Sequence, residues 1–276
     1  MFRKQDGGIR VCSRKTVLNR NVFLTIPIKH ILIHVGTFSI GVKMKSVSQS
    51  KIRGALLGLG IGDALSMPVH WYYNRWALEN DYGQVVDYLK PRNPHPDSIL
   101  WRSQYKASIA RGEILHDQAR YWGKRSLHYH QFLKAGENTL NVKICRLLVD
   151  SLNQNRAYDG NPLQEVILGQ LQVQNNPLLG HPFTKLLKEP DETVIGKYFS
   201  TACYVEDAVP AVIYLALKYH QDPEKALTVN TNLGGDNAGR GAVLGALLGA
   251  AHGTEKFPEH WVGGLVEPLP DFIKVF

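Results

Sequence analysis

The sequence predicts an all-α protein, an orthogonal multi-helix single domain over residues 46–276, and three observations support this class. Apolar residues recur at helical spacing in several segments, whereas alternating strand patterns are almost absent. Two segments, 53–65 and 230–253, combine small apolar residues with closely spaced glycines. With 276 residues, 44% of them hydrophobic, the chain is long enough to bury a sizeable core.

Residues 1–45 are predicted to be a basic N-terminal extension outside this domain. Residues 1–50 carry the whole net charge of +8, and the remainder holds 23 basic and 23 acidic residues. A neutral body favours neither nucleic acid nor a membrane as a partner. We expect 1–43 to lack structure; a targeting peptide for an organelle is the first alternative, because the segment is basic and nearly free of acids, and a folded part is the second.

Cysteine usage bears on the compartment. The chain has three cysteines without motif spacing, and an odd, sparse set suits a reducing environment. We therefore expect a cytoplasmic protein, unless 1–43 directs it to an organelle.

Glycine and proline divide the first half of the chain. A capped, glycine-rich helix is predicted over 48–65, with Pro68 ending it. A helical turn follows the aromatic residues 70–73. Residues 90–97 are a proline-rich loop, and 98–130 form a long aromatic loop, a kind of segment that is usually functional when it is ordered.

The second half is predicted to consist of helices separated by short loops. Apolar residues three and four positions apart mark the helices, and glycine, proline and asparagine mark the loops. The expected helices are 138–152, 163–171, 198–220, 223–227 and 238–253, and the expected loops include 174–192 and the glycine loop 229–237.

The glycines inside the two small-residue helices need a compensating interaction. Each interior glycine costs roughly 0.5–1 kcal/mol relative to alanine. Close backbone approach inside an all-helical core would offset that cost. Each of the two segments also carries a Gly-Asp pair, so the two buried helices could bring Asp63 and Asp236 to one site.

The glycine loop itself has two interpretations. Free N–H groups of Gly234 to Asn237 at a helix start could bind an anion such as a phosphate. Alternatively, Asp236 is a helix N-cap and the glycines serve packing only.

A second candidate motif follows the aromatic loop. Glu137, Asn138 and Thr139 begin a helix, where an acid is stabilised electrostatically and the other two can act as caps. His128 and His130, together with His116, have the residue types of a zinc site, although hydrogen-bonded structural histidines are the more common outcome.

Taken together and in this order, the motifs resemble the ADP-ribosylglycohydrolase family. RGALLGLGIGDAL (53–65) is similar to the family's N-terminal helix, and GENTLN (136–141) stands where the family has Thr-Asp-Asp-Thr. NLGGDNAGRGAVLGALLGA (232–250) is similar to its Gly-Gly-Asp-Thr-Asp-Thr block. HWYY, HYHQFLKAGENTLN and GGDNAGRG look closest to a divergent branch similar to the jellyfish J-crystallins. No counterpart of the family's middle Asn-Gly block is evident, and 155–195 looks short.

The resemblance implies an all-α enzyme that hydrolyses the bond from the ribose anomeric carbon of ADP-ribose to an acceptor. It implies ADP-ribose or an ADP-ribosylated substrate as the partner. It also implies a pair of Mg²⁺ ions held by carboxylates.

This chain departs from the family pattern at the metal positions. Asn138 and Ala238 replace two acids, His70 replaces an acid after the first helix, and only Glu137 and Asp236 keep a carboxylate. We therefore expect at most one weakly held Mg²⁺, since Mg²⁺ needs anionic ligands to give up its water.

By resemblance, each motif residue receives an expected role. Glu137 and Asp236 are the catalytic candidates, and they and Thr139 are the metal candidates. The substrate-binding candidates are Gly234, Gly235, Asn237, Arg240, His128, His130 and Asn138. The alternative is a non-catalytic member, crystallin-like and structural or binding a nucleotide.

Overall fold

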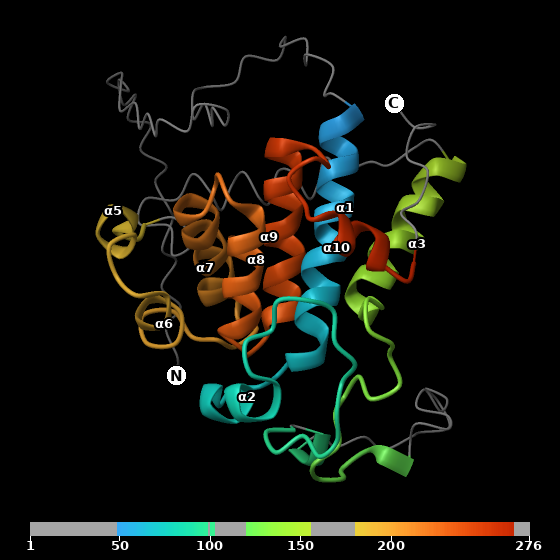
Figure 1. Cartoon of the computed structure of the whole chain (residues 1–276), viewed down its shortest axis with the longest axis vertical. Coiled ribbons are helices and arrows are strands. Elements are labelled where there is room, and N and C mark those ends of the chain that lie inside the picture. The colour runs from blue at the N-terminus through green and yellow to red at the C-terminus, as the bar shows by residue number, and fades with distance from the viewer. Residues whose placement is uncertain (1–48, 99, 103–119, 156–179, 268–276) are drawn as a thin grey trace, which may run out of the picture. The chain divides into compact units, whose positions relative to one another are not determined.

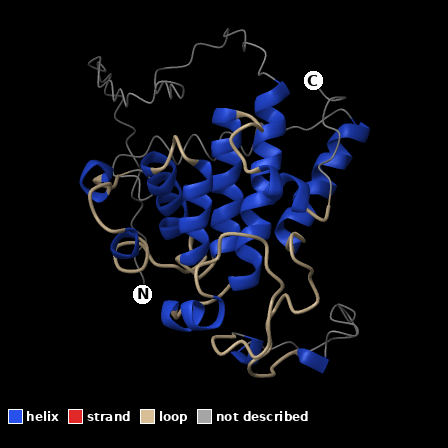
Figure 2. Cartoon of the chain, in the orientation of Figure 1, coloured by secondary structure: helices blue, strands red, loops and turns tan. Residues whose placement is uncertain are grey.

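The computed structural model describes residues 49–98, 100–102, 120–155 and 180–267, and within them every regular element is a helix (Figures 1 and 2). The all-α prediction is confirmed. The α-helices are α1 (Gln49–Ser66), α2 (Arg75–Tyr82), α3 (Leu140–Asn155), α5 (Phe183–Leu186), α6 (Asp191–Val194), α7 (Val205–Lys218), α8 (Pro223–Asn232), α9 (Asn237–His252) and α10 (Glu259–Gly264), and the 3₁₀ helices are η1 (Met67–Val69) and η2 (Leu100–Arg102).

Helices α1 and α9 lie side by side at the centre of this domain (Figure 1). Helices α7 and α8 pack on the outer side of α9, and α3 contacts α1 on its other side. The two central helices are the two small-residue segments of the sequence, which are separated by about 170 residues of chain.

Glycines line the contact between α1 and α9 in three antiparallel pairs. A Cβ atom added to Gly62 would lie 1.9 Å from the carbonyl oxygen of Gly241, and one on Gly58 would lie 2.0 Å from that of Gly245. In the reverse direction the two distances are 2.4 and 2.0 Å. The third pair, Gly54 and Gly249, is as tight. The two backbones therefore touch, which confirms that close approach compensates for the glycines.

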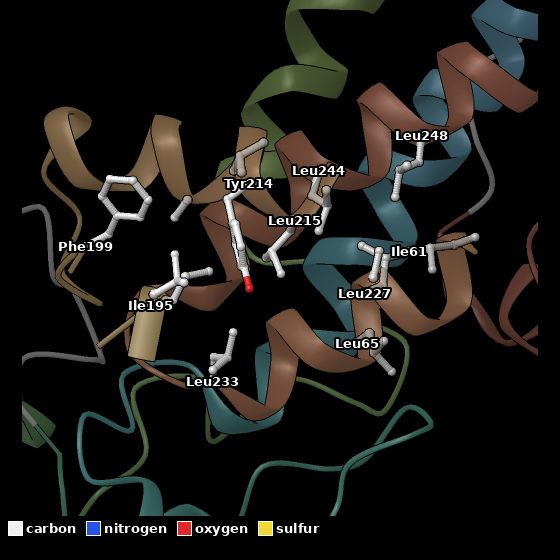
Figure 3. Packing of buried hydrophobic residues seen from close by; sticks show 14 of the residues in the cluster. Ile61, Leu65, Ile195, Phe199, Tyr214, Leu215, Leu227, Leu233, Leu244 and Leu248 are labelled. Atoms are coloured by element: carbon white, nitrogen blue, oxygen red, sulfur yellow. The ribbon is translucent and has the colours of Figure 1, made fainter. Parts of the chain in front are cut away.

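An apolar core forms where the central pair meets α7 and α8 (Figure 3). Ile61 and Leu65 of α1 are fully buried there, next to Leu244 of α9 and Leu227 of α8. Figure 3 also shows Phe199 and Ile195 packed near Tyr214 of α7, so the segment before α7 closes one end of the core.

One stretch of the described chain, Gln49–Val69, is long and apolar enough to cross a membrane by length and composition. Within the molecule, 72% of its most apolar window is buried. That burial, on α9 and the core, is the environment of a central helix of a globular domain.

Several predicted boundaries need correction. Residues 198–204 are not helical, because the carbonyl of Phe199 accepts from Gly196 and the amide of Ser200 donates to the Asp207 side chain, so α7 begins at Val205. The expected loop 174–192 contains α5 and the start of α6, each of which follows a proline at its N-cap position. Helix α8 runs to Asn232 and so includes the first residues of the expected glycine loop.

The remaining predictions agree with the structure or lie outside the described part of the chain. Helices α1, α3 and α9 begin and end within three residues of their expected bounds. The helix expected at 163–171 and most of the aromatic loop 98–130 lie outside the described residues. Helix α10, which buries Trp261 completely, was not expected.

Candidate functional site

The turn between α8 and α9 is fixed by Gly234 and Gly235, each with φ +68°. This left-handed conformation favours glycine over any residue with a side chain. A Cβ on Gly234 would lie 2.3 Å from the carbonyl oxygen of Tyr72, and one on Gly235 would lie 2.3 Å from that of Thr201. The turn is therefore held between two other segments of the backbone.

The amides of this turn already have protein acceptors. Gly235 donates its N–H to the carbonyl of Tyr72 (2.6 Å), and Asp236 donates to that of Thr201 (2.9 Å). The Gly234 amide donates to Thr231, and the Asn237 side-chain amide also donates to the Thr231 carbonyl. For Gly234, Gly235 and Asp236 the expectation that these N–H groups hold a phosphate fails in this conformation, because the donors bond inside the protein. The binding role expected of Asn237 stays a prediction.

The side chain of Arg240 stabilises the same turn. Its guanidinium donates to the carbonyls of Gly234 (2.6 Å) and Thr201 (3.1 Å) and to the side chain of Asn230 (3.3 Å). The residue is only 2% exposed, and burial lowers the pKa of the guanidinium to about 10. Arg240 therefore serves the turn, and this arrangement contradicts its expected contact with a phosphate.

Asp236 occupies the N-cap position of α9, yet its side chain makes no capping hydrogen bond. Its Oδ1 lies 2.7 Å from Nε2 of His70, and its side chain remains 19% exposed while that of His70 is 4% exposed. Burial alone would raise the pKa of the carboxyl, but the hydrogen bond from His70 and the nearby charges hold it below its usual value. Asp236 is therefore a carboxylate at neutral pH and is aimed by His70.

The other nitrogen of His70 continues into a histidine cluster. Nδ1 of His70 lies 2.7 Å from Nε2 of His130, and the His130 backbone N–H donates to Nδ1 of His128 (3.0 Å). Nε2 of His128 donates to the carbonyl of Pro68 (2.9 Å). Burial lowers the pKa of His128 to about 3 and that of His130 well below its usual value, so both rings are neutral.

Aromatic side chains pack against this histidine cluster. Trp71 has a positive φ of 70°, which is rare for a residue with a large side chain. Its ring lies 4.6 Å from that of His70 and 4.6 Å from that of Tyr129. The Trp71 amide also donates to the Gly235 carbonyl (2.8 Å), which ties the histidine segment to the glycine turn.

Asp63 organises the second candidate motif from inside α1. Its carboxylate accepts from the Thr139 amide (2.7 Å), the Thr139 hydroxyl (2.6 Å) and the Asn138 side chain (3.0 Å). Asp63 is fully buried, and burial raises the pKa of its carboxyl even though these three donors act in the opposite direction. Asn138 and Thr139 are 1% exposed, so they are bound to Asp63 and do not face a ligand.

Glu137 lies at the start of the same motif but is engaged differently. Its Oε1 is 2.7 Å from Nζ of Lys143, and its Oε2 accepts from the Lys134 amide (2.9 Å). Burial would raise the pKa of Glu137, but the hydrogen bonds from Lys143 and Lys134 and the charges of these two lysines together outweigh it, and the pKa is lowered. The structure therefore pairs Glu137 with a lysine and does not bring it into hydrogen-bonding contact with Asp236.

These residues do not fit a pair of magnesium ions. Each expected ligand already has a protein partner. Glu137 accepts from Lys143, Asp236 is bonded to His70, and the Thr139 hydroxyl donates to Asp63. Across the described residues, no three His, Cys, Asp or Glu side chains gather as a metal site would require. The weak single Mg²⁺ site stays a prediction, and no step proposed below uses a metal.

The zinc alternative finds no support in the described residues. Both nitrogens of His128 are used, one as an acceptor and one as a donor, so neither is free for a metal. His116 lies outside the described part of the chain.

A cleft of about 680 Å³ borders the glycine turn on the side of Thr201. The start of α2 contributes the aromatic rings of Tyr73 and Trp76, and Arg75 and Lys197 add positive charge. Burial and the charge of Asp236 raise the pKa of Tyr73 to about 12, which indicates that Tyr73 lies near Asp236. Tyr73 and Thr201 therefore connect the cleft to the turn that carries Asp236, although Asp236 itself does not line the cleft.

Fold and site together describe a helical protein with a glycine turn and a carboxylate that is held by a histidine. The sequence profile of the ADP-ribosylglycohydrolase family matches residues 44–176 and 168–275. The chain belongs to the ADP-ribosylglycohydrolase family. The two matched ranges overlap at 168–176, within the segment 155–195 that looks short in the sequence. No curated protein matches the chain.

Sequence reasoning missed two connections in this site. The bond between His70 and Asp236 joins residues 166 positions apart. The available signal was that His70 stands where the family has an acid. The second is the set of bonds from Asn138 and Thr139 to Asp63. Asp63 was expected to approach Asp236, and no hydrogen bond of the described residues joins the two carboxyl groups.

Substituting the second glycine of the turn tests how tightly it is held. We expect Gly235→Ala to lower the free energy of unfolding by about 2 kcal/mol, because the strained φ and the contact with Thr201 both oppose a side chain. The matched control is Gly123→Ala, which has φ +77° but no atom within 4 Å of the new Cβ, so it carries only the backbone cost of about 1 kcal/mol. If chemical denaturation gave the same loss of unfolding free energy for both variants, the contact with Thr201 would not constrain the turn.

Proposed function

We propose that this chain cleaves an ADP-ribosyl glycosidic bond, N- or O-linked, with Asp236 as its reactive carboxylate and with weakened dependence on metal. The observation that carries the proposal is the 2.7 Å bond between Asp236 and His70, at the position where the family resemblance places an acid. A histidine that replaces an acid and then orients the remaining carboxylate is a change of mechanism, whereas a simple loss of function would leave Asp236 without a partner.

The chemistry follows from the charge of Asp236. Cleavage of a glycosidic bond passes through an oxocarbenium-like state, which an adjacent carboxylate stabilises. Oδ1 of Asp236 is held by His70, and Oδ2 has no hydrogen-bond partner among the described residues. In the proposed step Oδ2 accepts a proton from water, the water oxygen bonds to the anomeric carbon, and the bond to the acceptor breaks. The acceptor takes a proton from solvent, and Asp236 releases its own.

The adjoining cleft supports an ADP-ribose-like ligand. Aromatic rings stack on a nucleobase, and the side chains of Arg75 and Lys197 attract a diphosphate. Trp76 is 73% exposed, so its ring is available to a ligand. The amides of the glycine turn have no part in this mode of binding, because the protein uses them internally.

The test is the release of ADP-ribose from N-linked and O-linked ADP-ribosylated substrates by the full chain. Asp236→Asn keeps the shape of the side chain and removes its charge, so we expect the rate to fall by roughly a hundredfold or more. Asp87→Asn is the matched control, because Asp87 is exposed and bonds only to the neighbouring Tyr88 amide. Equal rates for wild type and Asp236→Asn would refute the role of Asp236.

A second candidate is a non-catalytic member of the family that binds an ADP-ribose-like nucleotide or serves a structural, crystallin-like role. It is favoured by one observation: Asp63 and Glu137, the acids of two of the family's motifs, are both committed to protein partners. Calorimetric binding of ADP-ribose without turnover of either substrate would establish the binding role. If neither binding nor turnover is observed, the structural role remains.

A further inference from the structure

The cleft beside the glycine turn contains three charged side chains that the protein leaves free. Arg75, Glu192 and Lys197 line it, all three residues are exposed, and within the described part of the chain no hydrogen bond or ion pair engages their side chains. The two cations are available to an anionic group of a ligand. A carboxylate only accepts hydrogen bonds, so Glu192 favours a ligand that also carries hydroxyl groups.

The residue before Glu192 fixes its place at the edge of the cleft. The Asp191 carboxylate accepts hydrogen bonds from three side chains of α7 and its C-cap. The donors are the hydroxyls of Tyr214 (2.7 Å) and Tyr219 (2.6 Å) and Nζ of Lys218 (3.0 Å). The start of α6 is therefore bound to α7, beside which it lies (Figure 1). Because the backbone is already ordered here, Glu192 can bind a ligand at a small entropic cost.

Glu192 and Thr201 are the two ends of one wall of the cleft. The Thr201 carbonyl accepts from the Asp236 amide (2.9 Å), so this end of the wall meets the glycine turn. Glu192 lies at the other end, close to α7. Burial is the main cause of the raised pKa of Tyr214 and of Tyr219, and the charge of Glu192 contributes to both. The cleft therefore has one end at the proposed reactive carboxylate and a distal end at Glu192.

The opposite wall, at the start of α2, follows the same order. Burial and then the charge of Asp236 raise the pKa of Tyr73 to about 12, so Tyr73 marks the end of this wall near the carboxylate. Trp76 comes one helical turn later, with Arg75 between them. Lys197 likewise comes between the two ends of the first wall. The two cations therefore belong to the middle of the cleft, where a diphosphate would lie between two ribose groups.

We propose that Glu192 is a specificity-determining residue, whose carboxylate binds the free hydroxyls of the adenosine ribose of an ADP-ribosyl ligand and rejects a phosphate in that place. The inference rests on the proposed function for the class of ligand. A carboxylate accepts from ribose hydroxyls. A 2′-phosphate adds a charge of about −1.5 to −2, which Glu192 repels while the two cations are engaged by the diphosphate. The substrate class is therefore an ADP-ribosyl group that carries no further phosphate.

Calorimetric titration of the full chain with ADP-ribose and with 2′-phospho-ADP-ribose tests the proposal. We expect the wild type to bind ADP-ribose more tightly by roughly tenfold or more. Glu192→Gln should bring the two dissociation constants within about threefold of each other, because the repulsion is lost. Glu192→Arg should reverse the preference, since a guanidinium pairs with a phosphate. The matched control is Glu189→Gln, which removes a charge from the same segment at an exposed residue outside the cleft and should keep the wild-type ratio.

Four results would overturn the proposal: equal binding of both ligands by the wild type, an unchanged ratio in Glu192→Gln, the same change of ratio in Glu189→Gln, or no binding of either ligand. Turnover of ADP-ribosylated substrates is measured separately on the same proteins. If the wild type discriminates between the ligands but cleaves no substrate, the proposed cleavage fails and the role of Glu192 stands. If it cleaves substrate but does not discriminate, the role of Glu192 fails and the proposed cleavage stands.

Discussion

Gly58→Ala is expected to destabilise the domain by about 3 kcal/mol or more, because α1 and α9 have no space for a methyl group between them. The new Cβ would lie 2.0 Å from the carbonyl oxygen of Gly245 and 2.5 Å from its carbon. Both are backbone atoms in the middle of a helix, so no side chain can rotate away. The central helices must separate, which also loosens the core that they share with α7 and α8.

The control for this prediction is Gly60→Ala, the same substitution two residues further along α1. There the nearest atoms, in Leu265 and Asn138, would be 3.6 and 3.7 Å from the new Cβ, which is ordinary contact. The better helix propensity of alanine is worth about 1 kcal/mol, so this variant should be as stable as the wild type or slightly more stable. Urea unfolding of the three proteins measures the difference. Similar stabilities for Gly58→Ala and Gly60→Ala would mean that the central helices are further apart than described.

Asn138→Asp should cost about 3–5 kcal/mol near pH 7, the second large effect. The Asn138 side-chain amide donates to the Gly60 carbonyl (2.7 Å) and to the Asp63 carboxylate (3.0 Å). A carboxylate in its place would present an acceptor to two acceptors, one of them the fully buried carboxyl group of Asp63. From the sequence, this substitution would restore a metal ligand of the family. In this structure the new carboxylate faces Asp63.

The loss should depend on pH in a defined direction. The neighbouring charge and burial raise the folded-state pKa of the new carboxyl above its unfolded value of about 3.9. A group with a raised folded pKa contributes its stability below the unfolded pKa and loses it as pH rises through the folded pKa. The variant should therefore approach wild-type stability near pH 4 and become weaker toward neutrality.

Asp63→Asn provides the matched control at the same contact. Its carboxamide oxygen can still accept from Thr139 and Asn138, and its N–H can donate to the Thr139 hydroxyl, so we expect a change of about 1 kcal/mol or less. Thermal melts of both variants across this pH range test the pair. If Asn138→Asp were as stable as Asp63→Asn at pH 7, the buried hydrogen bonds described around Asp63 would be contradicted.

The fold was predictable where one local signal was strong. The glycines of α1 and α9 cost too much for a solvated helix, so the sequence already indicated two helices in backbone contact. It could not indicate which glycines face each other, since the pairing of 58 with 245 depends on how the intervening helices bring α9 back. The error at residues 198–204 has a similar cause: the segment is apolar enough for a helix, but its backbone bonds to itself and to the glycine turn.

The candidate site was predictable in part. Asp236 stood out because glycines precede it, and the two interpretations, cap or ligand site, could not be separated from sequence. In the structure the carboxylate bonds to His70 and makes no capping hydrogen bond to α9, so the side-chain cap is excluded and the ligand site stays a prediction. The roles expected for Arg240 and for the turn amides failed for one physical reason. Buried donors take the nearest carbonyl, and a sequence does not reveal which carbonyls fold back onto them.

The central claim is that the carboxylate held by His70 activates the water without a pair of metal ions. The dependence of the rate on metal tests this claim most directly. The measurement is the initial rate of ADP-ribose release by the full chain, with excess chelator and with excess magnesium. The account predicts that the two rates agree within about twofold, because the expected metal ligands are engaged by protein groups. A loss of roughly tenfold or more under chelation, reversed by magnesium, would contradict it.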